Sequence, residues 1–477
     1  HHLNVGMNSP DILQGLNPAQ HDAVIHRGGP LLVVAGAGSG KTRVLTQRIA
    51  HLIQEDNINP FQILAITFTN KAAQEMKDRV AALVGPVAEK MWVSTFHSAC
   101  VRILRRDAEQ LGYPSAFSIY DQADATRLTG YVVRDLGLDN KKFVARSVHA
   151  QISNLKNELI STDAALDRAD GIFGRKIAEI YDEYQRRLRS AGAMDFDDLL
   201  TVTVQLFDNF PNALSHYQER FQHVLVDEYQ DTNPAQNDIV LKLGDKHRNV
   251  FVVGDSDQSV YAFRGADIRN ILEFEKAFPD TGVVVLDQNY RSTQTILDAA
   301  NSVISNNYGR KPKELWTDKS GGDKIVMYRA DDEVDEAAWI IGELQRLHGQ
   351  GGLRWSDVAI FYRANAQSRI LEERLAGVSV PYRVVGGTRF YDRREVKDAL
   401  AYLRAVVNPA DEVSLKRVLN VPKRGIGDSS VTRLDQYANS NGVPFYEALN
   451  DWPEVGISGP AKKGLANFTE LLRKLSN

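Results

Sequence analysis

The amino-acid sequence predicts an α/β protein of several domains, built on parallel sheets covered by helices. Its 477 residues exceed what one hydrophobic core usually holds. The fractions of 43% hydrophobic and 25% charged residues are those of an ordinary globular protein. Short, continuous apolar runs, each followed by a turn and a helical pattern, recur along the chain. Continuous apolarity indicates strands buried on both faces, as in a parallel sheet between helices.

Five of these apolar runs are expected to form strands of a first sheet. In chain order they are residues 31–34, 63–66, 224–226, 250–253 and 283–286. Ligands of such sheets bind in the loops at the carboxyl ends of the strands. The polar and glycine-rich clusters of this sequence fall in those loops, so they are the candidate functional sites.

The strand pattern gives way to helical periodicity in two places. Between Ile172 and Leu188, apolar residues recur every three to four positions among basic ones, which is typical of an amphipathic helix. Strand-like runs return at 324–328 and 358–362. The expected division is a first α/β domain (7–103 and 194–286), its helical insertion (104–193), a second, incomplete α/β domain (287–385) and a second, incomplete helical insertion (386–477).

Composition excludes several classes of protein. The single cysteine, Cys100, excludes an internal disulfide and a multi-thiolate metal site. We expect no membrane span and no signal peptide, and the residues before Met7 look like a tag remnant. The net charge of −4 argues against a uniformly basic protein. It leaves room for local basic patches that bind nucleic acid reversibly.

The first apolar run leads into a glycine-rich loop and then a helical pattern. The loop reads Ala35-Gly36-Ala37-Gly38-Ser39-Gly40-Lys41-Thr42. Strand, glycine-rich loop, Lys-Thr and helix are the context of a phosphate-binding P-loop, although Ala35 stands where the usual pattern has Gly. Lys41 would bind the β- and γ-phosphates and Thr42 would bind Mg²⁺. The alternative is an ordinary glycine-rich turn, which this context disfavours.

An acidic pair and a glutamine follow two further strand runs. Asp227 and Glu228 come directly after 224–226, where Asp227 would hold Mg²⁺ through water and Glu228 would orient and deprotonate the attacking water. Gln258 follows the next strand and would contact the γ-phosphate or the water. Alone, an Asp-Glu pair is usually solvated and Gln258 would be a loop residue; after a P-loop, the catalytic interpretation is favoured.

Taken together, these motifs resemble the superfamily 1 helicases of the UvrD/PcrA/Rep group. The strings that carry the resemblance are 35–42, Val226-Asp227-Glu228-Tyr229-Gln230-Asp231-Thr232-Asn233 and Gly254 to Ala266. Further blocks match in the expected order: 16–20 (Q motif), 67–73 (motif Ia), 94–98 (motif Ib) and Leu286 with 289–292 (motif IV). The resemblance covers nearly the whole chain and implies two RecA-like motor domains that use ATP and Mg²⁺.

The resemblance also assigns roles around the nucleotide. Gln20 would recognise the adenine edge, and Tyr290 would stack on the base. Arg43 would help to hold the nucleotide. Arg291 would reach from the second motor domain to the γ-phosphate as an arginine finger and so report closure of the cleft.

Binding of a single DNA strand needs aromatic faces for bases and donors for phosphates. The aromatic candidates are Phe68, Phe196, Tyr261 and Phe263, and the polar candidates are Thr69, Asn70, His97, Arg264, Arg363 and Asn365. Without the resemblance, Phe68 and Phe263 are more simply explained as core residues. Gly425 and Gly427 resemble a duplex-contacting loop, with an ordinary interhelical turn as the alternative.

The expected function is an ATP-dependent DNA helicase that moves 3′–5′ on single-stranded DNA, by resemblance. Its substrates would be single strands and single-strand/duplex junctions, and repair or replication proteins would be its partners. We expect a cytoplasmic, nucleoid-associated monomer or dimer. Two family motifs do not occur before Asn477, so we expect the C-terminal part to be missing. The alternatives are the helicase half of a helicase–nuclease, a non-catalytic DNA-binding fragment and, more distantly, a P-loop ATPase acting on proteins.

Overall fold

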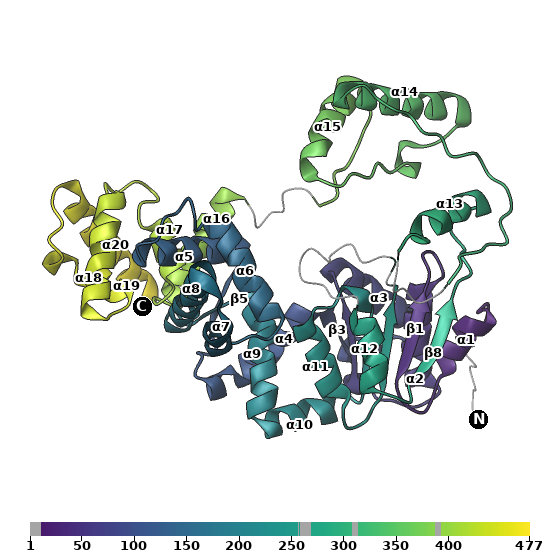
Figure 1. Ribbon diagram of the computed structural model, residues 1–477, viewed down its shortest axis with the longest axis horizontal. Helices are drawn as coiled ribbons and strands as arrows, with labels where there is room; N and C mark the ends of the chain where they lie inside the picture. The colour runs from purple at the N-terminus through teal and green to yellow at the C-terminus, as the bar shows by residue number, and fades with distance from the viewer. Residues whose placement is uncertain (1–10, 256, 258–268, 308–312, 387–392) are drawn as a thin grey trace, which may run out of the picture. The chain divides into compact units, whose positions relative to one another are not determined.

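The computed structural model describes residues 11–255, 257, 269–307, 313–386 and 393–477 (Figure 1). The chain forms two compact units. The first runs to Gly322 and includes Ala401–Asn477, and the second is Asp323–Leu400. The first unit contains the sheet, the helical insertion and the C-terminal helices from Ala401 onward. The domain boundaries expected from the sequence stay predictions.

A six-stranded parallel sheet forms the centre of the first unit. Its spatial order is β3-β2-β6-β7-β1-β8. The strands are β1 (Leu31–Ala35), β2 (Ile63–Thr67), β3 (Trp92–Thr95), β6 (His223–Val226), β7 (Val250–Gly254) and β8 (Gly282–Leu286). All five predicted strands are therefore confirmed. The sixth, the edge strand β3, was not predicted because it contains Ser94 and Thr95 and so has no continuous apolar run; all four of its residues are half-buried.

Helices cover both faces of this sheet, as the continuous apolar runs predict. They are α1 (Pro18–Ile25), α2 (Lys41–Gln54), α3 (Asn70–Val84), α4 (Phe96–Asp107), α9 (Phe196–Asn209), α10 (Pro211–Arg220), α11 (Pro234–Gly244) and α12 (Arg269–Ala277). Helix α13 (Gln294–Ile304) follows β8 in the chain. Within β1, Leu32 and Val34 belong to a core shared with α4 and α9 to α12. Their neighbours Leu31 and Val33 belong to a core shared with α1 to α3. This alternation is the two-residue period of a strand.

Helices α3 and α4 each begin at a threonine that caps the helix just after a strand. Thr69 comes two residues after β2, and its hydroxyl accepts a hydrogen bond from Ala72 N at 3.0 Å, which caps α3. Thr95 ends β3 and caps α4 in the same way, accepting from Ser98 N at 3.1 Å. Such caps stabilise a helix by about 1 kcal/mol. They also fix where the loops of the carboxyl edge begin.

The insertion is helical, as predicted, apart from one short parallel strand pair. Its elements are β4 (Ser118–Tyr120), α5 (Gln122–Asp135), α6 (Ala145–Asn157), α7 (Thr162–Arg168), α8 (Gly171–Ser190) and β5 (Ala193–Asp195). Tyr184 and Leu188 of α8 are fully buried in the core of the insertion, which explains the apolar period of that helix.

The C-terminal helices pack on this insertion. They are α16 (Arg394–Val407), α17 (Glu412–Val418), α18 (Asp428–Asn441), α19 (Phe445–Asn450) and α20 (Pro460–Ser476), with their own core. The hydroxyl of Tyr120 donates to Asp411 Oδ1 at 2.7 Å, and Asn408 Nδ2 donates to Ala191 O at 2.7 Å. Arg134 donates to Asp435 Oδ2 at 2.8 Å. The expectation of helices after residue 386 holds for the described residues.

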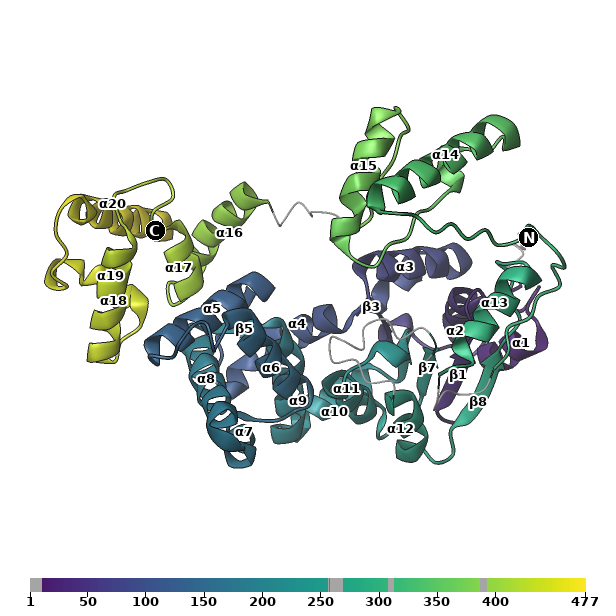
Figure 2. The ribbon, with the colours of Figure 1, turned by 45° about the horizontal axis from the view of Figure 1, so that its top comes forward.

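The second unit is small and corrects one expectation. Helices α14 (Glu333–Gly351) and α15 (Ser368–Gly377) lie side by side (Figure 2) and share a core that includes Ile341 and Leu375. The strands expected at 324–328 and 358–362 do not form. Met327 and Phe361 are each 93% exposed. A strand needs a neighbour for its backbone groups, and in the described part of the chain neither segment pairs with one.

No helix within the described residues is long and apolar enough to cross a membrane.

Candidate active site

The carboxyl ends of four neighbouring strands bring the predicted nucleotide-binding residues together. The P-loop follows β1, Asp227 and Glu228 follow β6, and Asp255 follows β7. Residues 289–292 follow β8. Because β6, β7, β1 and β8 are adjacent and parallel, their loops meet at one edge of the sheet (Figure 1). This is the edge where ligands of open parallel sheets bind.

Two glycines of the P-loop are required by their surroundings. Gly38 and Gly40 have φ values of 64° and 81°, a left-handed region that residues with a Cβ rarely adopt. A Cβ on Gly40 would lie 2.6 Å from Gln20 Nε2, and one on Gly38 would lie 2.5 Å from Asn289 Nδ2. The loop therefore presents backbone N–H groups at the start of α2, where a phosphate can approach closely.

The P-loop lysine contacts both predicted carboxylates. Lys41 Nζ lies 3.4 Å from Asp227 Oδ1 and pairs with Glu228 Oε1. Burial alone disfavours the charged lysine, but Asp227 and Glu228 outweigh it and hold the pKa of Lys41 above its usual value. Burial raises the pKa of Asp227, against the effect of Lys41 and together with that of Glu228. The charge states of Lys41 and Asp227 therefore depend on each other and on the carboxylate of Glu228.

Glu228 is held in a strained position by a partner that the sequence analysis missed. Its φ is 50°, which costs a non-glycine residue roughly 1 kcal/mol or more. The amide of Gln230, which is fully buried, donates to Glu228 Oε2. The carbonyl oxygen of the same amide accepts from Asp255 N at 2.9 Å. Gln230 thus links the candidate general base to the end of β7. A neutral amide two residues after the acidic pair was the available signal.

A second missed residue, Lys313, contacts the loop after β7. Its Nζ lies 2.5 Å from Asp255 Oδ1 and also pairs with Asp257. The side chain is only 2% exposed. No motif marks Lys313 in the sequence, and its partners lie 56 and 58 residues away. The sequence therefore does not predict this contact, and only the structure shows it.

The residues expected at the adenine lie next to the P-loop. Gln20 Nε2 donates to Ser39 O at 2.9 Å, and Gln20 Oε1 accepts from Asn17 N at 3.0 Å. Asn17 Nδ2 in turn donates to the hydroxyl of Tyr290 at 2.9 Å. The Tyr290 side chain is 44% exposed and so retains a free ring surface. Arg43 donates to Gln14 O at 2.7 Å and anchors the segment before α1.

Arg291 also lies against the P-loop. The amide N of Tyr290 donates to Gly38 O at 2.9 Å, and Asn289 Oδ1 accepts from Arg291 N at 2.9 Å. A Cβ on Gly38 would lie 3.0 Å from Arg291 Cβ. Arg291 is exposed and belongs to the same compact unit as Lys41. The role of Arg291 at the γ-phosphate stays a prediction.

Thr42 and Asp227 fit a magnesium ion. Mg²⁺ prefers oxygen ligands and is usually held by one or two protein groups together with phosphate oxygens. Thr42 supplies a hydroxyl in the first turn of α2, and Asp227 supplies a carboxylate at the end of β6. Since burial disfavours the charged form of Asp227, a divalent cation there would be stabilising. The donor set is consistent with the expected cofactor.

Two of the candidate DNA-binding residues meet at the starts of different helices. The rings of His97, on α4, and Phe196, on α9, have centroids 6.2 Å apart and are nearly perpendicular at 74°. Phe196 is 44% exposed, so one face can stack on a base. Burial lowers the pKa of His97, which favours its neutral form. Phe196 is therefore the accessible ring of this pair, and His97 is half-buried beside it.

The remaining candidates are scattered or lie outside the described residues. Phe68 is half-buried against Phe96, with ring centroids 5.9 Å apart, so it contributes to the core as well as to the surface. Thr69 and Asn70 are exposed at the start of α3. Arg363 and Asn365 are exposed in the second unit. The residues outside the described ranges are Gln258, Tyr261, Phe263 and Arg264.

The predicted duplex-contacting loop is a tight turn before α18. Gly425 has a φ of 75°, and a Cβ there would lie 3.0 Å from Pro460 Cβ. Ile426 is buried, whereas Gly427 has open space around its Cα and immediately precedes the helix. The geometry agrees with both interpretations left open by the sequence.

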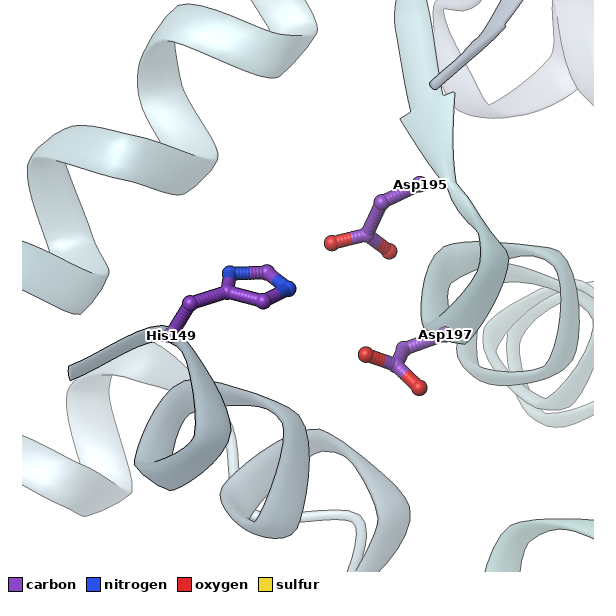
Figure 3. A group of neighbouring side chains, drawn as sticks. All are labelled: His149, Asp195 and Asp197. Atoms are coloured by element: carbon purple, nitrogen blue, oxygen red, sulfur yellow. The ribbon is translucent and has the colours of Figure 1, made fainter. Parts of the chain in front are cut away.

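A cluster of buried polar side chains involves the residues on both sides of Phe196 in the chain. His149 of α6, Asp195 at the end of β5 and Asp197 of α9 point toward one another (Figure 3). Lys156 Nζ, also from α6, donates to Asp195 Oδ2 at 2.7 Å and to Asp198 Oδ1 at 3.0 Å. This lysine supplies the counter-charge and ties the insertion to the first turn of α9. The cluster therefore fixes the position of the Phe196 backbone.

Comparison with known proteins identifies relatives of the whole chain. The family model for the UvrD/REP helicase N-terminal domain matches residues 16–279, and that for the UvrD-like helicase C-terminal domain matches residues 284–455. The ATP-dependent DNA helicase PcrA of Bacillus subtilis is 50% identical over 98% of this chain and 64% of its own length. PcrA of Staphylococcus aureus is 50% identical over 97% of this chain and 63% of its own. The chain thus spans just under two thirds of these relatives.

Proposed function

The chain belongs to the UvrD/REP helicase family, and from this premise we propose that it is the motor part of an ATP-dependent DNA helicase. The observation that carries the proposal is the contact of Lys41 with Asp227 and Glu228 at the carboxyl edge of the sheet. A P-loop lysine and an acidic pair within one ion-pair network are the parts that phosphoryl transfer to water needs.

In this proposal, ATP binding rearranges the network. The β- and γ-phosphates attract Lys41 away from Glu228, which leaves Glu228 with Gln230 as its remaining partner. Glu228 then accepts a proton from a water molecule, whose oxygen attacks the γ-phosphorus while ADP leaves. Thr42 and Asp227 would hold Mg²⁺, which supplies positive charge to the β- and γ-phosphate oxygens. Arg291 would add a second positive charge to the γ-phosphate from beside Gly38.

The proposed second substrate is single-stranded DNA. Phe196 offers an exposed aromatic ring with the half-buried His97 beside it, and Thr69 and Asn70 offer polar groups at the start of α3. Stacking of bases on aromatic side chains contributes about 1–3 kcal/mol per base and tolerates any sequence. We propose single-strand/duplex junctions as the substrate of unwinding, movement in the 3′–5′ direction, and a role in DNA repair or replication at the nucleoid.

The test measures ATP hydrolysis by this 477-residue chain with and without an oligonucleotide of thymidine. We expect DNA to stimulate turnover, and Glu228→Gln to lower kcat by about 100-fold or more while ATP still binds. Phe196→Ala should weaken DNA binding without changing the unstimulated rate. A chain that binds DNA but hydrolyses no ATP under any condition would instead be a non-catalytic DNA-binding fragment.

A further inference from the structure

Lys313 reaches the candidate active site from a segment that is held in place beside α13. Asn301 Nδ2 of α13 donates to Leu315 O at 2.9 Å, and Asn301 Oδ1 accepts from Leu315 N at 3.1 Å. A Cβ on Gly36 would lie 2.2 Å from Leu315 Cδ2 and 3.6 Å from Lys313 Cε. The segment 313–315 therefore packs directly on the P-loop, at a position where only a glycine leaves room for it.

The ammonium group of Lys313 is buried against two carboxylates of the loop after β7. Its Nζ lies 2.5 Å from Asp255 Oδ1 and also pairs with Asp257. The side chains of Lys313 and Asp255 are 2% and 3% exposed. Buried ion pairs are screened much less than exposed ones, so they constrain the positions of their partners more strongly. Lys313 therefore fixes where the first residues of this loop lie.

The loop that Lys313 holds contacts the candidate general base through one amide. Asp255 N donates to Gln230 Oε1 at 2.9 Å, and the amide nitrogen of Gln230 donates to Glu228 Oε2. The packing is close, because a Cβ on Gly254 would lie 3.0 Å from Gln230 Oε1 and 3.2 Å from Gln230 N. Gln230 is fully buried, and a buried amide that loses a partner has no water to replace it. A shift of Asp255 would therefore displace the amide that orients Glu228.

We propose that Lys313 is a positioning residue for ATP hydrolysis, acting through Asp255 and Gln230 on Glu228. The inference rests on the proposed function, in which Glu228 activates the attacking water. Lys313 lies in the region matched by the C-terminal family model, whereas its carboxylate partners lie in the region matched by the N-terminal one. A contact between the two regions thus sets the geometry of the general base, and water is activated efficiently only while the segment 313–315 is seated on the P-loop.

The first test compares two substitutions of this lysine. Lys313→Met keeps the aliphatic packing and removes the charge, whereas Lys313→Arg keeps the charge. ATP hydrolysis is measured with single-stranded DNA present. We expect Lys313→Met to lower kcat about tenfold while the KM for ATP changes by less than about twofold. Lys313→Arg should recover most of the lost kcat. An unchanged kcat in a folded Lys313→Met chain would overturn the proposal.

Lys416→Met is the matched control. Lys416 is 4% exposed and pairs with Glu412 and, at 2.9 Å, with Asp435. It is thus another buried lysine that contacts two carboxylates, but it lies in the C-terminal helices. We expect both methionine variants to have a lower melting temperature, because each leaves buried carboxylates without their lysine. Only Lys313→Met should lower kcat. An equal fall of kcat in both variants would mean that lost stability lowers the rate, and would overturn the proposal.

A double variant tests the route through Gln230. In a chain that carries both Lys313→Met and Gln230→Ala, we expect kcat to fall no further than in the more impaired single variant, because both changes break the same series of contacts. Losses that multiply would show that the two residues act separately, and would overturn the proposed route. If Lys313→Met does not fold, Asp257→Asn takes its place. This change removes one of the two ion pairs and should lower kcat about threefold, and an unchanged kcat would overturn the proposal.

Hydrogen–deuterium exchange separates failure of this inference from failure of the proposed function, because it needs no activity. Exchange in peptides that cover residues 228–232 and 250–255 should become faster in Lys313→Met and stay unchanged in Lys416→Met. Unchanged exchange in these peptides of Lys313→Met would overturn the positioning role, whether or not the chain hydrolyses ATP. A wild-type chain that hydrolyses no ATP would overturn the proposed function itself, even where the exchange results show that Lys313 holds the loop.

Discussion

At the residue scale, the chemistry of the candidate active site depends on how Glu228 is oriented. Its left-handed backbone turns the carboxylate between Lys41 on one side and Gln230 on the other. An amide donor aligns a carboxylate without neutralising it, so Glu228 can still accept a proton. Gln230 therefore acts as a positioning residue in the proposed mechanism, through Glu228 rather than on ATP.

We expect Gln230→Ala to lower kcat by roughly tenfold while the KM for ATP changes little. A hydrogen bond to a charged group contributes about 1.5–3 kcal/mol, and 1.4 kcal/mol corresponds to a factor of ten. Steady-state ATPase kinetics with single-stranded DNA measure kcat and the KM for ATP separately. Gln222→Ala, at a glutamine just before β6 whose side-chain amide donates to the backbone carbonyls of Gln218 and Glu219, is the control. A fall in thermal stability that accounts for all of the lost activity would argue against positioning.

The same residues show what local sequence can predict. Lys41, Asp227 and Glu228 are predictable because the P-loop and the acidic pair follow buried strands, and parallel strands end at one edge. Gln230 and Lys313 are not, because their contacts depend on a positive φ and on a segment distant in the chain. Gln258 and Tyr261 lie outside the described residues, so their roles stay predictions.

At the scale of elements, the contact between α6 and α9 buries more carboxyl groups than its one lysine can neutralise. Three aspartates, Asp195, Asp197 and Asp198, share one lysine, Lys156. Burial raises the pKa of Asp197 to about 7, and Asp195 adds to the rise, while Lys156 and Ser153 oppose it. The folded protein thus prefers Asp197 protonated, whereas the unfolded chain ionises near its ordinary pKa of about 3.9.

Asp197→Asn should therefore remove a pH-dependent loss of stability. For a carboxyl whose folded pKa is raised, stability is fully present below the unfolded pKa and is lost as pH rises through the folded pKa. We expect the stability of Asp197→Asn relative to wild type to be higher at pH 8 than at pH 5, by on the order of 1 kcal/mol. Urea denaturation at both pH values measures this difference.

The control for this effect is Asp167→Asn, at an exposed aspartate of α7 in the same insertion. It should show no difference between the two pH values. If Asp197→Asn and wild type keep the same stability difference at pH 5 and pH 8, Asp197 does not remain protonated in the folded protein and the charge balance of the cluster must differ.

Element prediction succeeded for strands that contain a continuous apolar run and failed where an apolar run and strand pairing do not coincide. The four central strands and the edge strand β8 each contain a continuous apolar run and were predictable, although Val283 and Val285 of β8 are exposed. The edge strand β3 contains Ser94 and Thr95 and carries no such signal. The runs 324–328 and 358–362 carry the signal but form no strand. An apolar run reports a tendency to be buried, and pairing with another strand is a property of the fold.

At the scale of the whole molecule, the first unit joins segments that are far apart in the chain. The C-terminal helices contact the insertion across more than 200 residues of sequence, through Asn408 with Ala191 and Asp411 with Tyr120. Sequence patterns predict each helical segment separately, since periodicity reports only which face of a helix is buried. They do not predict the contact, which depends on single polar groups.

Asp411 is the centre of this contact. It is fully buried, and its Oδ1 accepts from the Tyr120 hydroxyl at 2.7 Å and from Ser414 N at 3.1 Å. Its Oδ2 accepts from Ser414 Oγ at 2.8 Å. The Tyr120 hydroxyl is the only one of these donors that comes from the insertion. It therefore links two parts of the unit rather than stabilising α17 alone.

We expect Tyr120→Phe to loosen the contact between the C-terminal helices and the insertion. Removing a hydrogen bond to a buried carboxylate costs about 1.5–3 kcal/mol, while the phenylalanine ring keeps the packing of Tyr120. Hydrogen–deuterium exchange should become faster in residues 408–418 and stay unchanged in β1 and β7. Tyr437→Phe, whose hydroxyl lies 3.4 Å from Asp451 at the surface, should alter neither region. Faster exchange throughout the sheet would mean that Tyr120 stabilises the whole unit, and unchanged exchange at 408–418 would mean that apolar packing alone holds the helices in place.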